Sequence, residues 1–156
     1  MNPTGIQQRG LYFEEFSAGQ TIISVGRTIT ESDIVSFAGL TGDYNQIHTD
    51  HEFSKSTPFG RRVAHGLLCL SIGMGLATRT GFIEGTVLAF REIVSWKFVR
   101  PVYIGDTIHI ELEVLETKEI RRLGGGLIQI KAEIKNQHGE VTAKGTWEAL
   151  ITSRPA

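Results

Sequence analysis

The sequence has 156 residues, 40% of them apolar and 21% charged, which is the usual mixture for one globular domain. Sixteen Lys and Arg against 17 Asp and Glu leave a formal net charge of −1, which argues against a nucleic-acid or membrane-surface binder. The one cysteine, Cys69, excludes a disulfide scaffold and fits a reducing cytoplasm. The longest apolar-rich run, 66–77, is shorter than the roughly 20 residues that span a bilayer. We therefore expect a cytoplasmic protein with a polar tail over 1–10 and one domain over 11–152.

The first half of the domain is predicted to be mostly helix and loop. Residues 20–27 are rich in β-branched side chains and indicate a first strand. Thr30 has the side chain of a helix N-cap, and the short amphipathic helix that follows is expected to end by Gly39 or Gly42. Residues 41–64 show no hydrophobic period, so we expect an ordered functional loop there.

Residues 65–79 predict a helix that is apolar on nearly every side. Such a helix has to be surrounded by other elements, and we expect it to be buried all round. Gly73 and Gly75 each lower helix propensity. We expect that this cost is offset because another backbone approaches the helix closely at these two residues.

The second half predicts a sheet. Apolar and polar residues alternate over 108–114, 128–134 and 141–151, the pattern of antiparallel strands with one buried face, and 136–139 has the composition of a hairpin turn. A longer strand over 86–99 is partly apolar on both faces, one of which a partner subunit could cover. With the first strand this makes about five strands, and a curved antiparallel sheet wrapped around the central helix, an α+β fold, is the economical arrangement.

Asp43 and His48 are the candidates for chemistry. A carboxylate and an imidazole that converge on one water can work as a general acid–base pair, although this spacing also occurs in ordinary loops. The buried helix begins near Gly66, where a free backbone N–H could bind an oxyanion and a carbonyl could approach closely. His65 is expected to be neutral and tied into hydrogen bonds of the loop.

Three segments carry a resemblance to a known family. FAGLTGDYNQIHTD at 37–50 resembles the hydratase motif of MaoC-like, (R)-specific enoyl-CoA hydratases. TPFGRRVAHG at 57–66 is similar to the segment that leads into their central helix, and FVRPVYIGD at 98–106 to a later strand and turn. The resemblance covers roughly 11–152. It implies a hot-dog fold, a homodimer or dimer-based oligomer, an acyl-CoA substrate, and no further cofactor.

The resemblance also implies roles for individual residues. Asp43 and His48 match the catalytic pair, Asn45 matches the Asn that helps to hold their loop, and Gly66 matches the donor to the thioester oxygen. Ser71 is a candidate for an assisting hydroxyl on the central helix, although bonding back to its own helix is an equal alternative. The family usually has Pro after the Asn where this chain has Gln46, which leaves the spacing intact but the geometry of the loop open.

Several other polar residues are candidates for binding. Arg61 and Arg62 could face the phosphates of coenzyme A, or belong to a solvated loop. Further basic candidates are Arg79, Arg91, Lys97 and Arg100, and the large aromatic residues expected to pack in the core or at a subunit interface are Trp96, Phe98 and Trp147. The cluster at 48–51, with Asp43, could also be read as a metal site, but no metal is expected because the stretch lacks helical periodicity and has no cysteine nearby.

The implied reaction is syn hydration of a trans-2-enoyl-CoA, or the reverse dehydration of an (R)-3-hydroxyacyl-CoA. One alternative is a hot-dog acyl-CoA thioesterase, which would release free thiol. The other is a non-catalytic acyl-CoA-binding subunit, which would bind its ligand without turnover. The sequence leaves open the acyl chain length, the carrier (coenzyme A or acyl carrier protein), and which member of the pair is the base.

Overall fold

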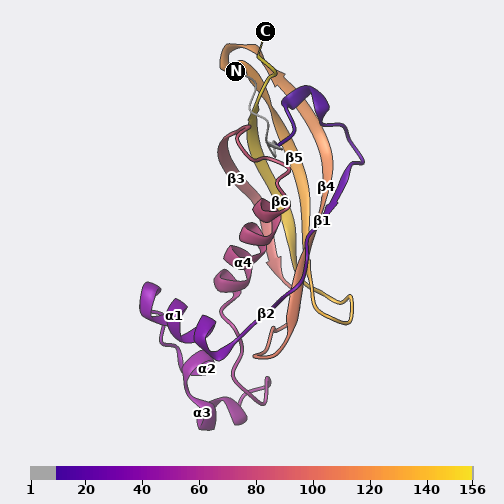
Figure 1. Ribbon diagram of the computed structural model, residues 1–156. Coiled ribbons are helices and arrows are strands. Elements are labelled where there is room, and N and C mark those ends of the chain that lie inside the picture. The colour runs from indigo at the N-terminus through magenta and orange to yellow at the C-terminus, as the bar shows by residue number, and fades with distance from the viewer. Residues whose placement is uncertain (1–9, 156) are drawn as a thin grey trace, which may run out of the picture.

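The computed structural model describes residues 10–155, so the expected tail lies outside the described residues except for Gly10 (Figure 1). Two 3-10 turns and four helices accompany six strands. The helical elements are η1 (Phe13–Glu15), α1 (Glu31–Thr41), α2 (Gln46–Thr49), α3 (His51–Lys55), α4 (Gly66–Arg79) and η2 (Arg121–Leu123). The strands are β1 (Thr21–Ile23), β2 (Arg27–Thr28), β3 (Val87–Phe98), β4 (Thr107–Ile120), β5 (Gly125–Lys135) and β6 (Val141–Thr152). None of the helices within 10–155 has the length and apolar character that crossing a membrane requires.

The strands form an antiparallel sheet in the order β1-β4-β5-β6-β3, with β2 also paired to β4. The predicted turn between β5 and β6 is confirmed, because Asn136 N–H donates to the Glu140 carbonyl at 3.0 Å and Gly139 adopts a φ of 74°. The long strands curve, and α4 lies against their concave side (Figure 1). This is the α+β arrangement that the sequence predicts.

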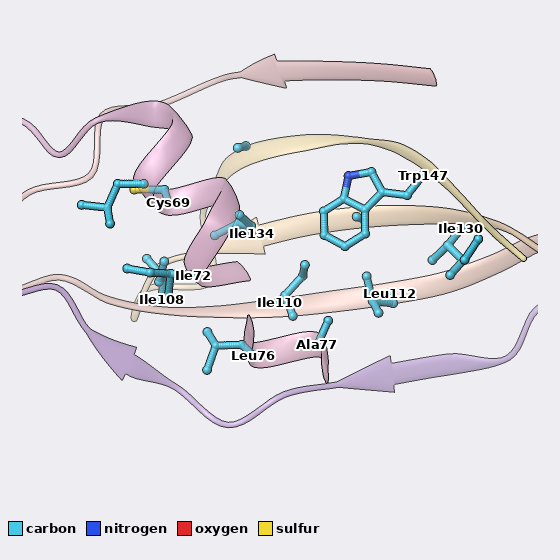
Figure 2. Close-up of a cluster of buried hydrophobic side chains, with 14 of the residues drawn as sticks. Cys69, Ile72, Leu76, Ala77, Ile108, Ile110, Leu112, Ile130, Ile134 and Trp147 are labelled. Carbon is cyan, nitrogen blue, oxygen red and sulfur yellow. The ribbon is translucent and has the colours of Figure 1, made fainter. Parts of the chain in front are cut away.

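The core lies between α4 and the inner face of the sheet. Ile108, Ile110 and Leu112 on β4 alternate with half-buried polar residues, as expected of a strand with one buried face. They pack with Ile72 and Leu76 of α4 in one cluster (Figure 2). Burial of a side chain of this kind stabilises the fold by about 1.5–3 kcal/mol, so the alternation decides which face of the sheet receives the helix.

Helix α1 begins and ends where the sequence predicts. Thr30 Oγ accepts a hydrogen bond of 3.3 Å from Asp33 N–H, and an Asp33 carboxylate oxygen accepts one of 2.8 Å from Thr30 N–H. This reciprocal capping box satisfies two N–H groups that the helix leaves unpaired. At the other end Gly42 takes a φ of 77°, which turns the chain toward the loop of the candidate site.

Two predictions about the first half need correction. The strand expected over 20–27 is divided into β1 and β2, so the sheet has six strands and not five. Between them Ser24 bonds to Ile110 through both its N–H and its hydroxyl, which interrupts regular pairing. The loop expected over 41–64 contains α2 and α3, which are too short to show a hydrophobic period.

Helix α4 is less enclosed than its composition predicts. One face, with Leu67, Ser71 and Gly75, is exposed in the single chain. The expectation that another backbone approaches the two glycines is also wrong. A Cβ on Gly73 would meet the Ile134 side chain at 2.7 Å, and a Cβ on Gly75 would have no neighbouring atom within 4 Å. Only one side of α4 therefore packs on the sheet.

Candidate active site

Three elements bring the predicted residues to one cavity. Asp43 follows α1, His48 lies in α2, and Gly66 is the first residue of α4; all three line a cavity of about 540 Å³. Most of the other lining side chains are apolar, and they include Phe37, Ile47, Phe59, Val63, Leu67, Phe98, Val99 and Val102. A mainly apolar cleft with a few convergent polar groups is the usual form of a small-molecule site.

His48 is buried and held in one orientation. Its Nδ1 lies 2.7 Å from the Val63 carbonyl, and because a carbonyl only accepts, Nδ1 carries the proton and Nε2 keeps its lone pair. Burial lowers the pKa of His48 below its ordinary value; the nearby His65 also lowers it, while the Val63 carbonyl and the Asp43 carboxylate act in the opposite direction. The ring is therefore neutral at physiological pH and can accept a proton at Nε2.

Asp43 is exposed at the mouth of the cavity, in a loop that Asn45 organises. One Asp43 carboxylate oxygen accepts a hydrogen bond of 3.2 Å from Asn45 N–H, and the Asn45 side chain accepts one of 3.2 Å from Ile47 N–H at the start of α2. Gln46 occupies the first position of α2. Pro is common at this position because the N–H that Pro lacks would have no partner within the helix. The helix forms with Gln46, so the spacing between Asp43 and His48 survives this departure from the family pattern.

Gly66 has a steric reason to be glycine. A Cβ at this position would lie 2.7 Å from Cε1 of Phe98, because the Phe98 ring packs directly over the start of α4. The first N–H groups of a helix have no partner within the helix, so Gly66 N–H can donate to an oxygen in the cavity. Phe98, expected to be a packing residue, thus also lines the cavity, and only the tertiary contact between β3 and α4 reveals it.

Two of the weaker candidates, Ser71 and Arg62, are bonded to groups outside the cavity. Ser71 Oγ donates to the Leu67 carbonyl at 2.8 Å on the exposed face of α4, so the single chain does not bring Ser71 to the cavity. Arg62 pairs with both carboxylate oxygens of Glu31, and this guanidinium holds the pKa of Glu31 below its usual range. Arg61, by contrast, is exposed.

Two basic residues lie at the rim of the cavity. The Arg61 guanidinium carbon is 3.9 Å from the centroid of the Tyr103 ring, and the Tyr103 hydroxyl donates to the carbonyl of Phe59, which lines the cavity. Arg100, which the sequence could not rank above the other basic candidates, lines the cavity itself.

His65 is nearer to the chemistry than the sequence suggests. Its predicted bond to the loop is confirmed, since Nε2 lies 2.9 Å from the Asp43 carbonyl. The structure adds a contact that no sequence pattern signals, because the ring of His65 stacks on that of His48 with centroids 3.8 Å apart. Cys69, one turn into α4, also lines the cavity, and burial raises the pKa of its thiol to about 12.

The metal-ligating groups in this region do not converge well. Asp43, His48 and His65 each have a ligand atom within 4.8 Å of the others. The two rings, however, are stacked at 28° with centroids 3.8 Å apart, so one metal ion cannot lie in the planes of both rings at bonding distance from each. Asp50 instead caps α3 by accepting from Phe53 N–H at 2.9 Å. The arrangement suits a pair that shares a water better than a metal ion.

Comparisons with known proteins match most of this chain to one family. A family model described as MaoC like domain matches residues 15–135, most of the chain. The 3-hydroxybutyryl-CoA dehydratase of Methylorubrum extorquens is 41% identical over 115 residues, which are 73% of this chain and 70% of that protein. Protein MaoC of Klebsiella aerogenes is 39% identical over 101 residues, which are 65% of this chain but only 30% of that longer protein.

Solved structures are similar over nearly the whole chain. A monoamine oxidase regulatory protein from Archaeoglobus has a TM-score of 0.89 at 40% identity, with 96% of this chain and 100% of that chain covered. The R-hydratase PhaJ1 from Pseudomonas aeruginosa has a TM-score of 0.78 at 27% identity, with 93% and 88% covered. A Mycobacterium tuberculosis protein with a double hot-dog fold, at a TM-score of 0.82, 19% identity and coverage of 96% and 46%, supports the fold alone. The chain has a hot-dog fold and belongs to the MaoC-like dehydratase family.

Proposed function

We propose that this protein is an (R)-specific enoyl-CoA hydratase, which adds water to a trans-2-enoyl-CoA or catalyses the reverse dehydration. One observation carries the proposal: Asp43, His48 and Gly66, the first residue of α4, line the same apolar cavity. An acid–base pair beside an oxyanion donor is the equipment for proton transfer next to a carbonyl. Relatives named dehydratase and R-hydratase support the same class of reaction.

In the proposed mechanism a water molecule is held between Asp43 and His48. The neutral His48 offers the Nε2 lone pair, so the pair can take one proton from water as its oxygen bonds to C3. One proton returns from the pair to C2 on the same face, so the charge of the pair is unchanged after each cycle. Gly66 N–H stabilises the enolate oxygen between these steps, and one such donor is worth about 10²–10³ in rate. No step needs a metal ion or a further cofactor.

The carrier end of the substrate is proposed to lie at the rim with Arg61 and Arg100. Both side chains are exposed, and a guanidinium can bind a phosphate through two hydrogen bonds. Arg62 is a poorer candidate because its guanidinium is already paired with Glu31. We place the reaction in the cytoplasm, where a free thiol such as Cys69 stays reduced.

The exposed edge of the sheet supports a homodimer as the working form. β3 is the edge strand of the sheet, because it pairs with β6 on one side and with no strand on the other within the described residues. Its side chains Leu88, Ile93 and Val94 are exposed. An apolar edge strand of 12 residues invites pairing with another chain, and a second copy offers a matching strand. Sedimentation velocity should show a dimer that Ile93→Lys dissociates; a wild-type monomer would contradict this part of the proposal.

The proposal is tested by the hydration of crotonyl-CoA, followed through the loss of enoyl-thioester absorbance, with free thiol measured in parallel. Wild type is compared with Asp43→Asn and His48→Ala. We expect absorbance to fall without thiol release, and both variants to lose at least about 10²-fold in rate. Thiol release would indicate a thioesterase. Binding without turnover, on crotonyl-CoA and on longer enoyl-CoAs, would indicate a binding subunit.

A further inference from the structure

His65 contacts both members of the acid–base pair. It is the residue directly before α4 and is 2% exposed. Its Nε2–H donates to the Asp43 carbonyl at 2.9 Å, and its ring stacks on the His48 ring at a centroid distance of 3.8 Å. Phe37 packs against the His65 ring, with centroids 5.0 Å apart. One imidazole therefore touches the backbone of one member of the pair and the ring of the other.

The segment 63–66 holds all three reacting groups. The Val63 carbonyl accepts from His48 Nδ1 at 2.7 Å, the His65 side chain bonds to the backbone of Asp43, and Gly66 supplies the oxyanion donor. This segment is itself fixed, since Ala64 N–H donates to the Val102 carbonyl at 2.8 Å. The distance between the acid–base pair and the oxyanion donor is therefore set by four consecutive residues.

The surroundings of His65 suit an uncharged ring. The Nε2 partner is a carbonyl, which only accepts, so Nε2 carries the proton. Nδ1 is buried and has no hydrogen-bond partner among residues 10–155. A second proton on Nδ1 would create a buried donor without an acceptor, beside His48. A neutral His65 can fix the pair without competing for the proton of water.

We propose that His65 is a positioning residue, which holds the Asp43 backbone and the His48 ring in the geometry that proton transfer requires. This inference rests on the hydratase function proposed above. Without the bond from His65, the exposed Asp43 loop is free to move away from the cavity. Without the stacked ring, His48 is free to turn about its bond to Val63. A displacement of about 1 Å in such a constellation can cost about 10²-fold in rate.

Two variants separate the hydrogen bond from the stacking. His65→Phe keeps an aromatic ring on His48 but loses the N–H donor, whereas His65→Gln places an amide N–H near the same position and loses the ring. Ile128→Val is the matched control, because it removes a buried methyl group from β5, outside the cavity lining. We measure kcat and KM for crotonyl-CoA from pH 5 to 9, the unfolding midpoint, and the NMR shifts of the His48 ring in the free protein.

We expect His65→Phe to lower kcat by about 10²-fold with KM changed by less than about threefold. His65→Gln, which keeps an N–H donor but loses the stacked ring, should also lower kcat, by a smaller factor than His65→Phe. Ile128→Val should lower the unfolding midpoint with kcat unchanged. Wild-type kcat in both His65 variants, or losses that follow the unfolded fraction as in the control, would overturn the inference.

The outcomes also separate this inference from the proposed function. If Asp43→Asn and His48→Ala keep full activity, or if no enoyl-CoA is hydrated, the proposed function fails. The NMR shifts then still decide about His65: perturbations in His65→Phe that centre on 42–48 support its positioning role, and unperturbed His48 and loop signals refute it. If the pair is essential but both His65 variants behave as wild type, only the inference about His65 fails.

Discussion

Gly66→Ala and Gly73→Ala should have opposite effects although both lie on α4. At Gly66 the new methyl group would meet the Phe98 ring at 2.7 Å, so the ring has to withdraw by about 0.7 Å to reach the 3.4 Å of ordinary contact. Phe98 is 52% exposed and can move at little cost, so the free energy of unfolding should change by less than about 1 kcal/mol. The displaced ring and the methyl group crowd the oxyanion donor, and kcat should fall about tenfold or more.

At Gly73 the methyl group would instead enter the core. It would lie 2.7 Å from Cδ1 of Ile134 and 3.5 Å from Cδ1 of Ile110, both completely buried. Overpacking of this kind costs about 1–3 kcal/mol, and for a chain of this size each kcal/mol lowers the unfolding midpoint by about 2–4 °C. The kcat of the folded protein should be unchanged, because Gly73 does not line the cavity.

Both variants are compared by thermal unfolding, followed by circular dichroism, and by initial rates on crotonyl-CoA. The reasoning is refuted if Gly66→Ala keeps wild-type kcat, since the methyl group and the displaced Phe98 ring would then not crowd the oxygen that the N–H binds. It is also refuted if Gly73→Ala loses kcat out of proportion to its loss of stability.

Three further predictions follow from the contacts at the site. Because burial lowers the pKa of His48, its ring gains a proton in the folded protein only at a pH below the ordinary pKa of about 6.5. The contribution of the neutral ring to the free energy of unfolding is therefore complete above this pH and is lost as the pH falls. The acid limb of the pH profile of kcat/KM should also lie below 6.5. A midpoint above 6.5 would contradict this assignment. Arg62→Gln should cost no more than about 1 kcal/mol of stability and leave KM unchanged, while Arg61→Gln should raise KM for crotonyl-CoA severalfold; the reverse pattern would assign the phosphates to Arg62. Since the pKa of Cys69 is raised to about 12, iodoacetamide at pH 8 should label this thiol only after unfolding in urea, and rapid labelling of the folded protein would show that the thiol is accessible.

Much of the fold could be predicted because its signals are local. The alternation over 108–114 and 128–134 selects the buried face of each strand without knowledge of its neighbours. Thr30 and Gly42 mark the ends of α1 through side-chain and backbone preferences of single residues. The motif from Asp43 to His48 predicts two site residues close together, and the structure shows that both line one cavity with Gly66.

The features that could not be predicted depend on contacts between distant segments. The pairing of Arg62 with Glu31, 31 residues away, removes a phosphate candidate that composition alone would retain. The stacking of His65 on His48 and the packing of Phe98 over Gly66 arise only when α4 meets the loop and β3. The exposed face of α4 was missed because an apolar composition does not distinguish burial in one chain from burial between two.

The most direct test of the central claim is the hydration of crotonyl-CoA in D₂O, with the product analysed by NMR and its configuration at C3 determined. The account predicts (R)-3-hydroxybutyryl-CoA with one deuterium at C2, added to the same face as the hydroxyl oxygen, and product formation at least about 10²-fold slower with Asp43→Asn or His48→Ala. An (S) product, addition of the two groups to opposite faces, or the same product at wild-type rate from both variants would contradict the claim that Asp43 and His48 deliver water to an enoyl thioester.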